Sequence, residues 1–270
     1  MSNTSSNLLN LYNYVEETSL KKRKSLWLNL GFWLKTNQVE KACENLFDET
    51  ISTFNIIKGS RILDAGFGFG IQDIYLANKY PECHITGVNI IEFQVQEANK
   101  IVKQKKLNDR IILLNEDAVS TSFDREQFDF VLAVESAFHF NTRENFFKEA
   151  YRILKPGGKI ALADCLPPID FVLDKDFKKS ADFMAIPYQN YYNIETYKEK
   201  MEFNGFNNII SRDISNYVLP YAAIEMLASD GWRSKLTIDL HSEINLIENL
   251  IKEFIKITTI GKYYIIIAQK

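Results

Sequence analysis

Short apolar runs alternate with longer segments of helical periodicity through most of the chain. The run at 61–65 is bounded by glycines, and the segment at 71–79 that follows it has helical composition. The predicted strands are 61–65, 84–88, 111–114, 128–134, 159–163, 208–214 and 263–268, with predicted helices at 71–79, 93–106, 143–154 and 194–204. Strands that alternate with helices predict an α/β fold, in which a mostly parallel seven-stranded sheet is covered by helices on both faces.

The pattern differs on either side of this alternation. Apolar residues at three- and four-residue spacing predict helices at 8–15, 39–57 and 238–257. After Asp164 the regularity lapses into a segment with several prolines and aromatic residues. The chain therefore divides into an N-terminal helical segment, an alternating core, a cap inserted after the fifth strand, and a C-terminal part that completes the sheet. The expected boundaries are 1–58, 59–165, 166–204 and 205–270.

Composition and charge narrow the class of protein. Of 270 residues, 46% are hydrophobic and 25% are charged, which is ordinary for a globular protein and excludes wholesale disorder. The 32 basic and 35 acidic side chains leave a net charge of -3, so the chain lacks the basic excess that binds nucleic acid. We therefore expect no nucleic-acid partner.

Three cysteines bear on the compartment and on metal binding. Cys43, Cys83 and Cys165 are far apart and form no CxxC pair, so neither a disulfide framework nor a metal site is expected. No stretch approaches the ~18 apolar residues of a membrane helix, and the first residues lack a signal-peptide pattern. We expect a soluble cytoplasmic protein without an integral membrane segment.

A glycine-rich loop follows the first predicted strand. The strand ends at Asp64, and Gly66, Gly68 and Gly70 alternate with larger residues after it. Glycines let a backbone turn sharply and approach a ligand closely, while the helix that follows offers free N–H groups. The GxGxG spacing differs from the GxGxxG spacing of dinucleotide-binding loops, so a pyrophosphate ligand is disfavoured.

The segment 62–70 resembles the first motif of class I S-adenosylmethionine-dependent methyltransferases. Three further segments resemble later motifs of that family and occur in family order: Asn-Glu-Asp-Ala at 115–118, Phe-Asp-Phe-Val at 128–131, and Ala-Tyr-Arg-Ile-Leu-Lys-Pro-Gly-Gly-Lys at 150–159. The resemblance covers roughly residues 39–165. It implies a Rossmann-like sheet and a transferase that uses S-adenosyl-L-methionine and releases S-adenosyl-L-homocysteine.

The resemblance also implies roles for residues at the strand ends. The glycine loop would pack beneath the amino-acid and ribose portions of the cofactor, with Asp64 orienting it. Asp117 and Ala118 would meet the adenine, although a solvated turn also explains Asp117. Glu135 would either bind the cofactor's ammonium group or cap the segment that follows it.

One position departs from the family pattern. The second strand usually ends in an acidic residue that binds both ribose hydroxyls, whereas Asn89 stands there in this chain. An amide still donates and accepts hydrogen bonds, but it lacks the charge-assisted strength of a carboxylate. Gln94 is expected to reach the ribose as well. Together with segments 135–140 and 29–33, these residues resemble small-molecule methyltransferases, including sugar and polyketide O-methyltransferases and tocopherol or sterol C-methyltransferases.

Two residues are candidates for catalysis. His139 and Asp164 follow the fourth and fifth predicted strands, and ligands of open α/β sheets bind at the carboxyl ends of the strands. The near-neutral intrinsic pKa of histidine suits a general base, so His139 is expected to take a proton from the substrate. Asp164 is expected to orient His139 or to share the base role. The alternative is that His139 is structural.

Aromatic residues indicate the class of acceptor. Phe138, Phe140, Tyr188 and Tyr192 cluster after the core motifs and are candidates for substrate binding. They favour a small, partly apolar acceptor, although residues of this kind also form ordinary cap cores.

The resulting hypothesis is a methyltransferase of natural-product biosynthesis that methylates a hydroxyl of a small molecule by direct displacement. One alternative is a C-methyltransferase of an isoprenoid or lipid-like acceptor. A second is a protein of this fold that binds the cofactor without methyl transfer, as a cyclase or an interaction module. The sequence leaves the acceptor, the methylated atom and the oligomeric state open, and a homo-oligomer is compatible with it.

Overall fold

The structure is a computed structural model that describes residues 25–170, 185–220 and 261–270. The helices predicted at 8–15 and 238–257 lie outside the described residues. Within the described ranges, no helix is both long enough and apolar enough to cross a membrane.

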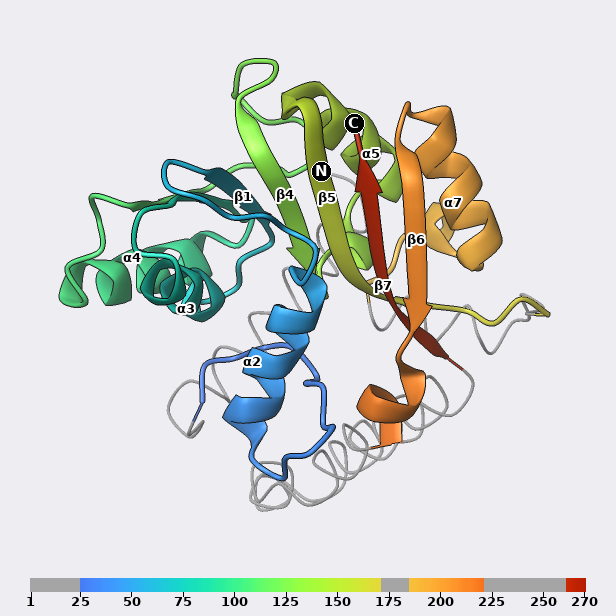
Figure 1. Ribbon diagram of the computed structural model, residues 1–270, viewed down its shortest axis with the longest axis horizontal. Helices are drawn as coiled ribbons and strands as arrows, with labels where there is room; N and C mark the ends of the chain where they lie inside the picture. The colour runs from blue at the N-terminus through green and yellow to red at the C-terminus, as the bar shows by residue number, and fades with distance from the viewer. Residues whose placement is uncertain (1–24, 171–184, 221–260) are drawn as a thin grey trace, which may run out of the picture.

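A seven-stranded sheet forms the centre of the described structure (Figure 1). Its strands are β1 (Arg61–Ala65), β2 (His84–Val88), β3 (Ile111–Leu114), β4 (Phe128–Val134), β5 (Leu154–Leu166), β6 (Asn207–Asp213) and β7 (Lys262–Gln269). They lie in the order β3-β2-β1-β4-β5-β7-β6. The neighbours from β3 to β5 are parallel, whereas β7 runs antiparallel to both β5 and β6. The mostly parallel, Rossmann-like sheet expected from the sequence is confirmed.

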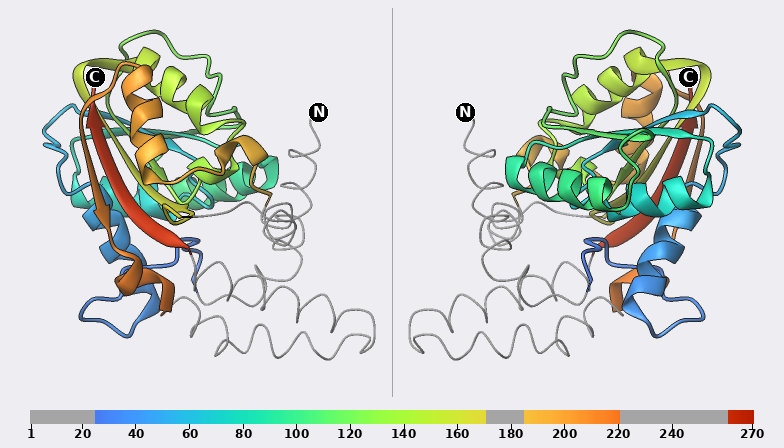
Figure 2. Two further views of the ribbon diagram at one scale, coloured as in Figure 1. Left: turned by 90° about the vertical axis from the view of Figure 1, so that its right-hand side faces the viewer. Right: turned by 90° about the vertical axis from the view of Figure 1, so that its left-hand side faces the viewer.

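Helices cover both faces of the sheet (Figure 2). One face carries α2 (Val39–Thr50), α3 (Ile71–Lys79) and α4 (Glu92–Gln104), and the other carries α5 (Arg143–Ile153) and α7 (Ile194–Phe203). Successive strand residues point to opposite faces, so Leu132 of β4 packs with the first group of helices and its neighbour Val131 packs with the second. Because these two apolar clusters bury both faces of the sheet, the sequences of its inner strands are nearly continuous apolar runs.

Two elements, β5 and α2, differ from their predicted bounds by more than two residues. β5 extends beyond the predicted 159–163, because β7 pairs with it as far as Leu166 and its first residue pairs with Phe128 of β4. α2 ends at Thr50 although apolar residues continue to 57. One of these, Phe54, stacks on Phe130 of β4 with ring centroids 4.4 Å apart, so it serves packing on the sheet rather than a helical stripe.

The segment predicted as a cap is described only in part. Its described residues include the single 3-10 turn η2 (Tyr188–Asn190) and the helix α7. Tyr197 and Met201 of α7 are fully buried in the same apolar cluster as β5, so this helix packs on the sheet itself.

The carboxyl ends of β1, β4 and β5 meet at one edge of the sheet. Asp64 of β1 is in register with Leu132 of β4, and Val134 of β4 is in register with Ala163 of β5. The loops that follow these strands therefore open on the same side, where ligands of α/β sheets bind.

Candidate functional site

The glycine loop adopts a backbone that requires glycine. Gly66 and Gly68 have φ of +87° and +59°, in the left-handed region that larger residues rarely adopt. A Cβ added to Gly66 would lie 2.9 Å from Oγ of Ser136 and 3.7 Å from Cζ of Phe140. One added to Gly68 would lie 2.7 Å from Cδ1 of Leu28. The loop after β4 and the N-terminal segment therefore both lie against the glycine loop, which ends at Gly70, the N-cap of α3.

Two buried carboxyl groups lie beneath this loop. Gln72 donates its Nε2–H to Oδ2 of Asp64, but Oδ1 of Asp64 and both oxygens of Asp73 receive no hydrogen bond within the described part of the chain. Burial raises the pKa of Asp64 to about 7, against the lowering effect of its bond to Gln72 and of a proton that the neighbouring Asp73 can donate. Burial and the charge of Asp64 also raise the pKa of Asp73 well above its ordinary value. One protonated carboxyl donating to the other satisfies the pair best, so the two groups titrate together.

The structure brings together the two residues expected at the ribose. Nδ2 of Asn89 donates to Oε1 of Gln94 over 2.8 Å and lies 3.4 Å from the carbonyl oxygen of Gly68. Oδ1 of Asn89 accepts from the N–H of Ile91 over 3.0 Å. Both side chains are buried beside the glycine loop. Because the amide of Asn89 already has partners, its binding of ribose hydroxyls stays a prediction that requires exchange of these bonds.

The residues expected at the adenine lie in the turn after β3. Asp117 is exposed and accepts the N–H of Val119 over 3.1 Å, whereas Ala118 is buried. This arrangement is compatible with the adenine role and with an ordinary solvated turn, so the role stays a prediction.

Glu135 connects three parts of the molecule. It follows β4 with φ of +53°, and its Oε1 accepts from the N–H of Leu30 and from the hydroxyl of Tyr263, each over 2.7 Å. Burial raises its pKa to about 7 despite these two donors. Glu135 thus ties the N-terminal segment and β7 to the loop after β4, and binding of an ammonium group by it stays a prediction.

His139 ends the short 3-10 turn η1 (Ala137–His139) after β4. Its Nδ1 lies 3.3 Å from the carbonyl oxygen of Ala185, and its ring contacts that of Phe138 with centroids 4.3 Å apart. Burial lowers its pKa to about 4, helped by the positive charge of Arg143 and opposed by the bond to Ala185. The near-neutral pKa expected from the sequence is therefore corrected. At pH 7 the ring is neutral, and a proton on Nδ1 leaves the lone pair on Nε2.

Asp164 has a different partner from the one expected. It is fully buried, and Arg143 binds it through Nε–H to Oδ2 at 2.8 Å and Nη2–H to Oδ1 at 3.0 Å. The hydroxyl of Tyr197 donates to Oδ2 over 3.2 Å. Both oxygens are thus occupied by donors other than His139, and a buried ion pair is costly to break. That Asp164 orients His139 or acts as a base stays a prediction, which requires exchange of these bonds.

The aromatic candidates separate into two groups. Phe140 lies against the glycine loop and Phe138 against the ring of His139. Tyr192, in contrast, is buried with its ring 5.5 Å from the guanidinium of Arg143, and Tyr188 is 61% exposed. Only the first two therefore border the candidate site in this structure, and substrate contact by any of them stays a prediction.

Four residues at this site were missed by sequence reasoning. They are Gln72, Asp73, Arg143 and Asn190. An acidic residue on the buried face of the helix after the glycine loop was a usable signal for Asp73. No local pattern marks Asn190, whose contacts join segments distant in the chain.

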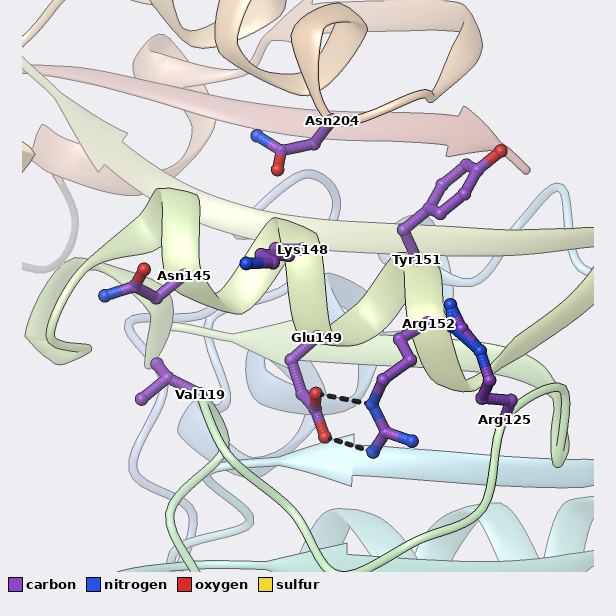
Figure 3. A pocket seen from close by; sticks show the side chains of 8 residues that line it. All are labelled: Val119, Arg125, Asn145, Lys148, Glu149, Tyr151, Arg152 and Asn204. Carbon is purple, nitrogen blue, oxygen red and sulfur yellow. Dashed lines mark hydrogen bonds and ion pairs between the residues drawn. The ribbon is translucent and has the colours of Figure 1, made fainter.

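A pocket of about 400 Å³ lies elsewhere, along the outer side of α5 (Figure 3). Its lining residues are Val119, Arg125, Asn145, Lys148, Glu149, Tyr151, Arg152 and Asn204. Glu149 and Arg152 are bonded to each other, and none of the residues predicted for catalysis or cofactor binding lines the pocket. Within the described ranges, no group of three or more His, Cys, Asp or Glu side chains is arranged to hold a metal ion.

Comparison with known proteins gives a family and several relatives. A family model described as a methyltransferase domain matches residues 63–162. The chain is 28% identical over 204 residues to erythromycin 3''-O-methyltransferase of Saccharopolyspora erythraea, an alignment that covers 72% of this chain and 66% of that one. It is 35% identical over 104 residues to sterol 24-C-methyltransferase of Clavispora lusitaniae, over 38% of this chain and 28% of the relative.

Solved structures share the fold. The [4+2]-cyclase SpnF superimposes with a TM-score of 0.80 at 20% identity, over 97% of this chain and 94% of SpnF. At that identity the likeness concerns the fold alone.

Proposed function

We propose that this chain, which belongs to the class I S-adenosylmethionine-dependent methyltransferases, transfers a methyl group to a hydroxyl of a small, partly apolar acceptor. Methyl transfer and the cofactor follow from the family. The acceptor atom, the acceptor class and the residues that act on it are the proposal. The observation that carries it is the position of His139, beyond β4 and on the loop that lies against the glycine loop.

The residues at the sheet edge fit the cofactor. Gly66 and Gly68 add no side chains of their own to the loop, and Gly70 is the N-cap of α3, whose first N–H groups suit a carboxylate. Asp64 is a buried carboxyl group beside the loop, and its ionised form suits a cationic partner such as the cofactor's ammonium group. When bound, S-adenosyl-L-methionine supplies an electrophilic methyl group on a sulfonium.

The chain's contribution to the chemistry is a positioned base. Nε2 of His139 would accept the proton of the acceptor hydroxyl, while Nδ1 keeps its proton toward Ala185. His139 would thereby become a cation, and this charge would replace the positive charge that a bound sulfonium brings to the site. Alignment of the hydroxyl with the methyl group would supply the rest of the rate enhancement, because ordering the reactants in advance lowers the entropic part of the barrier.

Phe138 and Phe140 support an apolar acceptor. Their rings border His139 and the glycine loop on the same side of the sheet. An apolar lining excludes water from the acceptor oxygen and favours ligands with hydrophobic parts. The O-methyltransferase named above acts on erythromycin according to its name, so a natural product with a free hydroxyl is the acceptor class that we propose.

Two other functions stay open as alternatives, and a relative in sequence favours only the first of them. The sterol C-methyltransferase relative favours carbon methylation of an isoprenoid or lipid-like acceptor, for which the aromatics and Glu135 would stabilise a carbocation. The fold shared with a [4+2]-cyclase keeps open a function without methyl transfer. For the compartment we propose a reducing cytoplasm, which the wide spacing of the three cysteines in the sequence supports.

A product assay tests the proposal. The protein is incubated with S-adenosyl-L-methionine and a panel of hydroxylated macrolides, sugars, phenols and isoprenoid alcohols, and both S-adenosyl-L-homocysteine and the mass of each acceptor are followed. We expect one S-adenosyl-L-homocysteine for each methylated product. Conversion of an acceptor without S-adenosyl-L-homocysteine would identify a cyclase-type function, and a methylated carbon would favour the second reading.

A further inference from the structure

Asn190, in the described part of the cap, holds the loop that carries His139. Its Nδ2 donates to the carbonyl oxygens of Phe138 and Phe140 over 3.0 and 2.8 Å. Its Oδ1 accepts the N–H of Arg143, the first residue of α5, over 2.9 Å. Asn190 is only 1% exposed, so its side-chain amide forms these hydrogen bonds with protein groups rather than with water. Residues 138–140 are thereby fixed at both carbonyls that flank His139.

Arg143 extends this network to the end of β5. Its Nη1 donates to the carbonyl oxygen of Asn190, and its Nη2 donates to that of Cys165 over 3.1 Å. The same guanidinium forms the ion pair with Asp164, and the rings of Tyr192 and Tyr197 each lie 5.5 Å from it. The cap, the η1 loop, α5 and β5 therefore meet at one buried charge pair, and the loop cannot move without disturbing it.

The cap also contacts the ring of His139 directly. The carbonyl oxygen of Ala185 lies 3.3 Å from Nδ1, and a carbonyl can only accept, so Nδ1 carries the proton. Ala185 and Asn190 belong to one short segment, 185–190. The same segment therefore sets both the backbone position of the η1 loop and the tautomer of the His139 ring.

We propose that Asn190 is a positioning residue: by docking segment 185–190 onto the η1 loop, it holds His139 in the tautomer that carries its proton on Nδ1. The catalytic use of this positioning rests on the proposed function, but the positioning itself can be tested without any acceptor.

Asn193, the N-cap of α7 just after segment 185–190, provides a matched control. It is also an asparagine with partners inside the protein, but its Oδ1 caps α7 by accepting the N–H groups of Glu195 and Thr196 over 3.0 and 3.2 Å. Replacing it removes a helix cap, which typically costs about 1 kcal/mol, without touching the η1 loop. A general loss of stability can thus be separated from a loss of positioning.

The test is imidazole NMR on the full chain with bound S-adenosyl-L-homocysteine. The chain has only three histidines, so the ¹⁵N resonances are assigned by substitution of each. In the parent we expect His139 as a single tautomer with unprotonated Nε2 and a pKa near 4. Asn190→Ala should give exchanging tautomers and raise that pKa by at least about one unit toward its ordinary value, because water reaches the ring. Asn193→Ala should leave both unchanged.

A second variant guards against failure of the first to fold. Asn190→Asp keeps an acceptor for the N–H of Arg143 but removes both donors to the carbonyls of residues 138 and 140, and it should shift His139 in the same way. Once an acceptor is known, both variants should lower kcat by ~10²-fold with little change in cofactor affinity, the scale of a misplaced catalytic group. Unchanged tautomer and pKa of His139 in folded Asn190 variants would overturn the proposal. Full turnover by His139→Ala would instead overturn the proposed base and leave the NMR result standing.

Discussion

Asp64 and Asp73 form a pair of buried carboxyl groups in which the charge of one raises the pKa of the other. The unfolded chain loses these protons near 3.8, whereas folding raises the pKa of Asp64 to about 7. Between these values the folded state binds more protons, so this contribution to stability is complete below about pH 4 and is lost as the pH rises toward 7.

Replacing one carboxyl by an amide tests this account. Asp73→Asn removes one charge and lets the new amide donate to Asp64, so the free energy of unfolding should fall less between pH 4 and pH 8 than in the parent. The gain at pH 8 should be on the order of a few kcal/mol, since each pKa unit corresponds to about 1.4 kcal/mol. Urea unfolding at several pH values measures it. An identical difference between variant and parent at every pH would mean that the pair does not titrate as described.

His139 sets the second prediction at this scale. Because burial lowers its pKa to about 4, the free enzyme should hold a neutral base at any pH above that value. The value of kcat/KM should therefore rise with pH through about 4 rather than through 6.5, and His139→Ala should lose ~10²- to 10⁴-fold in kcat while it retains cofactor affinity. A pH profile of parent and variant decides. If kcat/KM of the parent instead rises through about pH 6.5 and this rise is lost in the variant, His139 would still be the base, but the buried environment that lowers its pKa would be refuted.

At the scale of elements, substitutions in the glycine loop test the cofactor site directly. Gly68 and Gly59 both have positive φ, but a Cβ on Gly68 would lie 2.7 Å from Leu28, whereas one on Gly59 would have nothing within 4 Å. Gly59→Ala should cost only the backbone strain, about 1 kcal/mol, and leave cofactor affinity unchanged. Gly68→Ala should in addition displace the loop or Leu28 and weaken binding of S-adenosyl-L-homocysteine by roughly tenfold or more, equivalent to about 1.4 kcal/mol. Calorimetric titration compares them, and equal affinity in the two folded variants would remove the loop from the cofactor site.

The junction of α5 with β5 separates two roles for Asp164. As the buried partner of Arg143, Asp164→Asn should destabilise the protein by roughly 3–5 kcal/mol, because it leaves a guanidinium without its counter-ion. A role as base instead requires a folded variant of near-normal stability that has lost turnover. Denaturant unfolding and kcat, measured on the same preparation, distinguish the two, and a stability change below about 1 kcal/mol with lost turnover would restore the catalytic role.

At the scale of the whole molecule, the local sequence pattern predicted those elements whose ends are set by neighbouring turn residues. β1 to β4 and α3 have the predicted bounds, since each is a short apolar run or helix enclosed by turn residues. α2 and β5 differ because partners distant in the chain decide where they end: Phe54 stacks on β4, and β7 lengthens β5.

The candidate site was predictable to a similar extent. The positions of the glycine loop, His139 and Asp164 at one sheet edge follow from the order of parallel strands. The partner of Asp164 and the lowered pKa of His139 do not, because they depend on Arg143 and on the partial burial of the ring by tertiary packing. Burial and charge pairing arise from tertiary contacts, which a single sequence does not display.

The central claim is methyl transfer to oxygen at this site, and the position of a labelled methyl group in the product tests it most directly. The protein is supplied with S-adenosyl-L-methionine carrying a ¹³C-methyl group and an accepted hydroxylated substrate, and the purified product is examined by ¹³C NMR. The account predicts a single enriched methoxy resonance that is nearly absent with His139→Ala. An enriched methyl group bonded to carbon, or a converted product without label, would contradict it.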